Sequence, residues 1–90
     1  MPRYVIERTF PEGFAMPGGA QGADAYRSVI ERNGLGGVTW LHSYVSDDRT
    51  KTFCVYDGPS PEAIRKAAAD NTLPVDGVTE VRVLVPYLYF

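Results

Sequence analysis

Alternating apolar and polar residues predict four β-strands along the chain. The first covers Arg3 to Thr9 and ends at a turn that contains proline and glycine. Two further runs, Val38 to Ser46 and Thr50 to Asp57, flank an aspartate-rich turn and therefore predict a β-hairpin. The last run extends from Val78 to Val85. Strands thus open and close the chain, with the hairpin in its middle.

Two helices fill the gaps between these strands. Apolar residues recur at helical spacing over about residues 20–33, and the Asn33-Gly34 pair predicts a left-handed end to this helix. The segment Ser60-Pro61-Glu62 predicts a second helix start, because serine caps free amides, proline fits the first helical position and glutamate complements the helix dipole. Asn71 and Pro74 end this second helix. The predicted order is βαββαβ.

This order predicts a ferredoxin-like α+β fold, in which a four-stranded antiparallel sheet carries both helices on one face. A length of 90 residues indicates a single domain over residues 1–90. So short a chain buries only about 60–65% of its unfolded surface, so we expect a homodimer. The aromatic tail at 86–90 is expected to be buried by the second chain.

The register of the hairpin follows from gathering its aliphatic residues on one face around a three-residue loop at 47–49. It pairs Leu41 with Val55, Ser43 with Phe53 and Val45 with Lys51. The same register places three further pairs on the opposite face: Trp40 with Tyr56, His42 with Cys54, and Tyr44 with Thr52.

We assign the aliphatic face of the hairpin to the helices and the aromatic, polar face to a dimer interface or ligand cavity. An aromatic patch open to solvent would promote unwanted association, so it needs a cover. On this assignment Trp40, Tyr44 and Tyr56 line a ligand pocket, or they pack in the dimer interface.

The residues with candidate chemistry lie on the same two strands. His42 is the only histidine of the chain and Cys54 the only cysteine. Imidazole and thiolate both bind transition metals, and the predicted pairing puts them within reach of one metal ion. Two ligands are too few, so Glu7, Asp57, a tyrosine oxygen or a symmetry mate has to contribute. The ordinary alternatives stay open: His42 as a hydrogen-bonded interface residue, Cys54 as a small buried hydrophobe, and Glu7 as the ion-pair partner of Arg8 or Arg82.

Five segments together resemble a family of small actinobacterial nickel-binding proteins, first catalogued as a domain of unknown function. The resemblance covers nearly the whole chain. These segments are 3–10, 38–48, 52–56, 60–65 and 79–83. The resemblance implies a ferredoxin-like homodimer that binds nickel at its surface, for sequestration or detoxification.

A second class of function is an enzyme that acts on a small molecule. In this alternative, an isomerase or oxygenase-like protein of the dimeric α/β-barrel type uses His42 as base and Glu7 as acid or orienting group. Tyr44 and Tyr56 are hydrogen-bond donors in its aromatic pocket. A further alternative starts from Pro2, which becomes an N-terminal secondary amine if Met1 is removed and is then similar to the general base of tautomerases.

Charge and composition limit the classes of partner that we expect this chain to bind. The net charge is −2 and the nine lysines and arginines are scattered, so no basic stripe forms and we expect no nucleic-acid binding. No apolar run approaches the roughly 20 residues of a membrane span. The start of the chain lacks an apolar signal core and a single cysteine forms no internal disulfide, so we expect a cytoplasmic protein. Nothing requires an organic cofactor.

Overall fold

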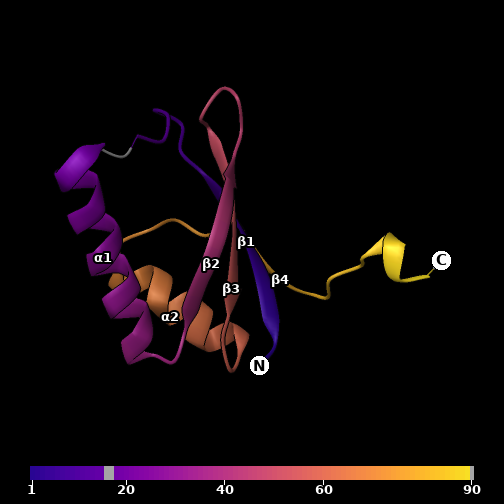
Figure 1. The fold of residues 1–90 in the computed structure, drawn as a ribbon. Coiled ribbons are helices and arrows are strands. Elements are labelled where there is room, and N and C mark those ends of the chain that lie inside the picture. The colour runs from indigo at the N-terminus through magenta and orange to yellow at the C-terminus, as the bar shows by residue number, and fades with distance from the viewer. Residues whose placement is uncertain (16–17, 90) are drawn as a thin grey trace.

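The computed structural model describes residues 1–15 and 18–89, so that residues 16, 17 and 90, including the last residue of the aromatic tail, lie outside the described residues (Figure 1). The elements are β1 (Arg3–Thr9), α1 (Gly19–Leu35), β2 (Thr39–Val45), β3 (Lys51–Asp57), α2 (Pro61–Asp70), β4 (Gly77–Val81) and a short 3₁₀ helix, η1 (Pro86–Tyr89).

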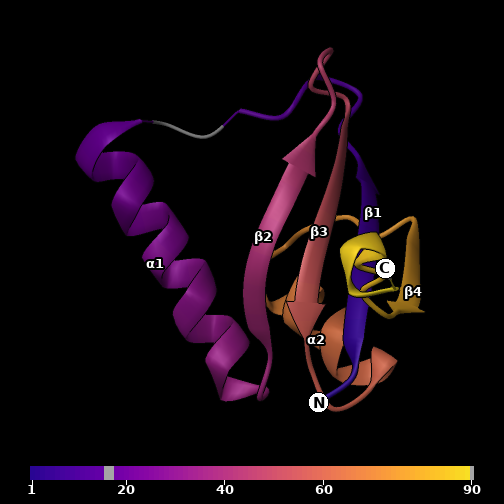
Figure 2. The same ribbon diagram turned by 45° about the vertical axis from the view of Figure 1, so that its right-hand side comes forward.

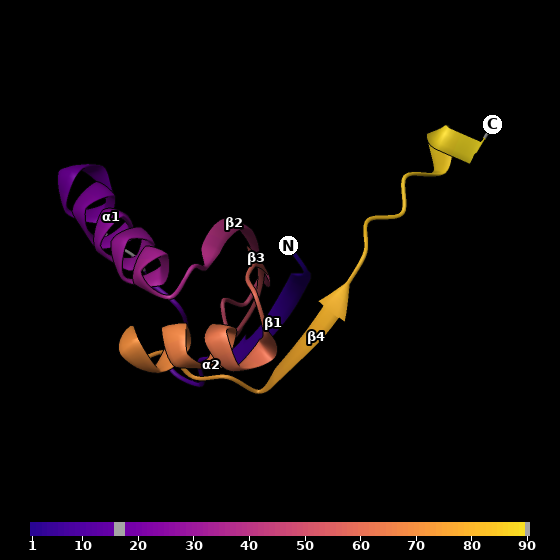
Figure 3. The same cartoon turned by 90° about the horizontal axis from the view of Figure 1, so that it is seen from below.

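The four strands form one antiparallel sheet in the order β2-β3-β1-β4. Both helices lie on one side of this sheet, and the segment after β4 leads away on the other side (Figures 1 and 3). The ferredoxin-like α+β fold predicted from the sequence is confirmed. We call the side without helices the open face.

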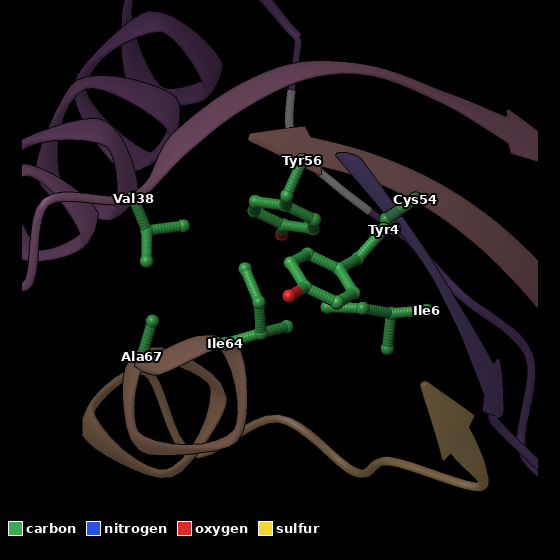
Figure 4. Packing of buried hydrophobic residues seen from close by; sticks show 7 residues of the cluster. All are labelled: Tyr4, Ile6, Val38, Cys54, Tyr56, Ile64 and Ala67. Atoms are coloured by element: carbon green, nitrogen blue, oxygen red, sulfur yellow. The ribbon is translucent and has the colours of Figure 1, made fainter. Parts of the chain in front are cut away.

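The core lies between α2 and the central strands (Figure 4). Alternation along β1 points Tyr4 and Ile6 toward α2, where Ile64 is only 1% exposed. Tyr4 pairs with Tyr56 of β3 in the sheet, so that two tyrosine rings share the helix-facing side. This arrangement decides which face of the whole sheet is the core face.

The second helix begins as predicted. The Ser60 hydroxyl accepts a hydrogen bond of 3.1 Å from the backbone N–H of Ala63, and Pro61 takes the first helical position. Asn71 caps the other end, and its side-chain amide donates to the Asn33 side-chain oxygen at 3.0 Å. This bond joins the ends of the two helices.

The first helix is longer than predicted. It begins at Gly19, within the glycine-rich segment 18–22, and continues past Asn33-Gly34 to Leu35. Asn33 is buried at 1% exposure, and its carbonyl accepts hydrogen bonds from the backbone N–H groups of Gly36 and Val38. The left-handed residue is Gly37, with φ of 73°, because these bonds close the helix beyond the predicted pair.

The fourth strand ends four residues earlier than predicted, at Val81. Its partner is β1, and the register pairs Val81 with Arg3, so a longer strand would need partners before Arg3. The next partner would be Pro2, and proline has no N–H to donate. The residues after Val81 are therefore free of the sheet, and Val83 and Leu84 are exposed.

The hairpin register is correct as far as Trp40, which pairs with Tyr56, and wrong after it. A β-bulge between Trp40 and His42 shifts the register by one residue, so His42 lies opposite Val55. Ser46 donates its backbone N–H to the carbonyl of Lys51, so the turn holds residues 47–50 instead of the predicted three. A shift of one residue moves every later side chain of β2 to the other face.

The assignment of faces was also wrong. The face that carries Cys54 and Tyr56 belongs to the buried core, whereas Val55 lies on the open face. The reason is β1: Tyr4 and Ile6 are the largest apolar residues of the central strand, and their partners on β3 are Tyr56 and Cys54.

The tight contact between Gly58 and α2 gives a test of this packing. A Cβ atom at Gly58 would lie 2.8 Å from Cδ1 of Ile64 and 3.4 Å from Cγ2 of Val38, both of which are buried. We expect Gly58→Ala to lower the free energy of unfolding by about 1–2 kcal/mol, since a packed core resists an added methyl group. Urea denaturation measures the change.

The matched control is Gly34→Ala in α1, where a Cβ meets nothing within 4 Å. This variant should be unchanged or more stable by about 0.5–1 kcal/mol, because alanine is the better helix former. A Gly58→Ala protein as stable as the wild type would contradict the close packing of α2 on the sheet.

Candidate functional site

The two faces of the hairpin carry different chemistry. Trp40, Ser43 and Cys54 lie on the helix side, where they line a cavity. His42 and Tyr44 lie on the open face, with their rings in an edge-to-face contact at 5.3 Å between centroids. The bulge therefore separates side chains that the sequence placed together.

His42 and Cys54 do not face each other, contrary to the predicted pairing. His42 is exposed and lies opposite Val55, whereas Cys54 is buried and lies opposite Ser43. The Cys54 thiol makes its hydrogen bond with the Thr52 hydroxyl, at 3.7 Å. One metal ion in a single chain cannot take both as ligands.

Glu7 lies on the open face, as His42 does, but two strands away in the sheet order. Its carboxylate forms an ion pair of 3.1 Å with Lys51, not with Arg8 or Arg82. Strand alternation explains this partner: Arg8 is on the opposite face of β1, while Lys51 is diagonal to Glu7 on the same face.

Within the part of the chain that the structure describes, no three histidine, cysteine, aspartate or glutamate side chains gather in a way that could hold a metal ion. Asp48 and Asp57 hold turns and strands of the hairpin in place. The hydrogen bond from Arg3 holds the pKa of Asp57 below its usual value, with the two groups 2.9 Å apart. The pKa of Asp48 falls to about 2, because the Thr50 backbone N–H and the hydroxyls of Ser46 and Thr50 donate to it in the turn.

The cavity between α1 and the sheet has a volume of about 360 Å³. Figure 2 shows α1 beside β2 rather than flat on the sheet, and the side chains of both elements line the space between them. The lining is mainly apolar and aromatic, with Phe10, Phe14, Tyr26, Val29, Trp40 and Tyr56 among its members.

Aromatic contacts hold the wall of this cavity. Trp40 stacks on Tyr56 at 6.5 Å and touches Tyr26 of α1 at 5.8 Å. The Trp40 indole N–H donates to the Ser43 hydroxyl at 2.8 Å. Trp40 and Tyr56, two of the three residues predicted for a ligand pocket, thus line one cavity, whereas Tyr44 lies on the opposite face.

Arg8 is the charged residue of the cavity wall, and it is only 2% exposed. Among the described residues no carboxylate pairs with it, and its Nε has no hydrogen-bond partner. The guanidinium lies over the Tyr56 ring, 5.8 Å from the centroid. Burial raises the pKa of Tyr56, against the opposing effect of the Arg8 charge, so the phenol is neutral at pH 7 and offers no counter-charge.

Sequence reasoning missed Arg8 as a site residue, although its position in the strand carried a signal. Tyr4, Ile6 and Arg8 alternate along β1 and share one face, so an arginine stands in line with two core residues. A buried arginine on a core face needs an explanation.

The enzyme alternative required His42, Glu7 and Tyr44 to share a pocket with Trp40 and Tyr56, and the structure places the two groups on opposite faces. Pro2 is exposed, and its carbonyl accepts a hydrogen bond from the Gly58 N–H at 3.1 Å.

In the described part of the chain, neither helix has the length and apolar character needed to cross a membrane.

The sheet order, the two helices on one face and the split between a cavity and an open face define a ferredoxin-like α+β protein. Residues 4–81 match the model of the family described as nickel responsive protein SCO4226-like. The chain belongs to this family, which confirms the resemblance found in the sequence.

A solved structure supports the fold. The crystal structure of SCO4226 from Streptomyces coelicolor A3(2) is similar with a TM-score of 0.73, over 92% of this chain and 99% of that chain. The two sequences are 16% identical, so the likeness concerns the fold. No curated protein matches the chain.

Proposed function

We propose that this protein binds nickel as a homodimer and that His42, on the open face of the sheet, is a metal ligand. The observation that carries the proposal is membership of a family named for its response to nickel. Imidazole is a good nickel ligand, and His42 is the only histidine of the chain. Its exposed ring is accessible to an ion from solution.

A single chain offers too few ligands around His42, because no group of three candidate ligands exists among the described residues. A two-fold contact between open faces supplies a second set of the same side chains. Glu7 is the candidate for a further ligand, because it lies on this face with 43% of its side chain exposed, and among the described residues only Lys51 forms an ion pair with it. Water completes the coordination.

The open face carries exposed aromatic side chains of the kind that a partner protein usually buries. Phe53 is 36% exposed and Tyr44 63% exposed there. The segment after β4 leaves on the same side, with Val83 and Leu84 exposed and Tyr87 82% exposed (Figures 1 and 3). Aromatic residues of this kind are enriched in interfaces, which supports a second copy as the partner.

Binding at an exposed histidine supports sequestration of the ion rather than catalysis with it. The cavity that could hold an organic substrate lies on the other side of the sheet from His42. A metal at His42 is therefore separated from any molecule in that cavity.

We expect His42→Ala to weaken nickel binding at least ten-fold, about 1.4 kcal/mol, with the fold intact because the side chain is exposed. Titration calorimetry with nickel chloride measures the affinity. Wild-type affinity should also fall in acid, because imidazole binds a metal in its deprotonated form.

Cys54→Ser is the companion variant, since Cys54 lies on the other face of the sheet. It should bind nickel as the wild type does. Equal nickel affinity in His42→Ala and wild type would remove His42 from the site, and a loss confined to Cys54→Ser would move the site to the cavity.

For the dimer we expect Tyr44→Glu to weaken self-association at least ten-fold, since it places a charge in the centre of the proposed contact. The control is Leu35→Glu, at a residue that is 90% exposed at the end of α1. Sedimentation velocity over a range of concentrations should show dimers for wild type and control. A monomeric wild type at micromolar concentration would refute the proposed assembly.

A further inference from the structure

A buried positive charge in an apolar cavity calls for an anion. Arg8 is only 2% exposed, it lines the cavity, and no carboxylate among the described residues pairs with it. The other arginine of β1, Arg3, shows the usual arrangement, with Asp57 at 2.9 Å. Taking an unpaired charge out of water is costly, and the Tyr56 ring offsets only part of that cost.

We propose that the cavity between α1 and the sheet binds a small monocarboxylic acid with an apolar, preferably aromatic, body, whose carboxylate pairs with Arg8. This site is distinct from the proposed nickel site and does not depend on it, because it lies on the opposite face of the sheet.

The chemistry of the wall selects this class of ligand. Arg8 supplies one positive charge, and a guanidinium presents a planar fork that matches a carboxylate. Its Nε is buried and has no hydrogen-bond partner, so the protein leaves part of the guanidinium unsatisfied. Thr52 lies in the same wall. One cation suits a singly charged group, whereas a phosphate dianion would keep an unpaired charge.

The rest of the wall suits an apolar body. Phe10 and Phe14 pack on each other at 5.2 Å, and Tyr26 and Trp40 pack at 5.8 Å, so aromatic pairs stand on different parts of the lining. A volume of about 360 Å³ is near the lower end of the roughly 300–1,000 Å³ of small-molecule sites. This size suits a single ring or a short aliphatic chain.

Trp40 makes the test direct, because it is the only tryptophan of the chain and lines the cavity. The probes are phenylacetate and 3-phenylpropionate, with phenylacetamide and 3-phenylpropionamide as neutral analogues of the same shape. Titrations follow Trp40 fluorescence and, separately, heat of binding. We expect each acid to bind at least ten-fold more tightly than its amide.

Arg8→Met should abolish the preference for acid over amide. It should also leave the ligand-free protein as stable as the wild type or more stable, because it replaces a buried unpaired charge with an apolar side chain of similar length. A purely structural Arg8 predicts the reverse, a marked loss of stability and an unchanged preference. The control Arg65→Met, at an exposed position of α2, should bind as the wild type does.

Val29→Phe keeps Arg8 in place and fills the cavity from α1, so it should weaken both acid and amide at least ten-fold. If Arg8→Met fails to fold, Val29→Phe still tests whether the ligand binds in this cavity. Equal affinity of acid and amide for the wild type, no binding of either acid, or unchanged acid binding by Val29→Phe would overturn the proposal.

Discussion

One extra residue in an edge strand determines which side chains of this protein can act together. The β-bulge between Trp40 and His42 lets Trp40 stay on the helix side while His42 and Tyr44 turn to the open face. Without it, strict alternation would put His42 beside Trp40, in the wall of the cavity. The bulge thus separates an aromatic cavity from an exposed histidine.

The central strand β1 determines which face of the sheet is buried, and therefore which two faces the bulge separates. Tyr4 and Ile6 of β1 pack on Ile64 of α2, and their sheet partners Tyr56 and Cys54 follow them into the core. The same alternation carries Arg8 into the cavity wall. Because α1 has only Gly22 and Asn33 buried, it closes on the sheet incompletely and leaves the cavity that Arg8 lines.

Local signals in the sequence predicted the order of the elements, and the start of α2 follows from Ser60 and Pro61 alone. Effects that depend on distant partners were not predictable in this way. The end of β4 depends on where β1 begins, and the length of α1 depends on a buried Asn33. A bulge has no clear mark in a run such as 39–45, where no glycine signals it.

The prediction of the candidate site was limited in the same way, by effects that local signals do not reveal. The sequence correctly singled out Trp40 and Tyr56 as a pair, because the register is regular up to that point. The predicted pairing of His42 with Cys54 extended this register across the bulge. The same prediction took the aliphatic residues Leu41 and Val55, rather than the tyrosines, as core residues. Tyr56 is nevertheless 4% exposed, since its ring packs on Tyr4 and Trp40. Family membership, not spacing, supports nickel as the metal.

The proposed nickel site lies on the open face, away from the cavity. Crystals soaked in nickel chloride and measured on both sides of the nickel absorption edge test it by locating the ion directly. We expect an anomalous peak at the His42 imidazole, on the side of the sheet without helices and next to a second copy of the chain. A peak inside the cavity beside Cys54, or strong nickel peaks with none at His42, would contradict it.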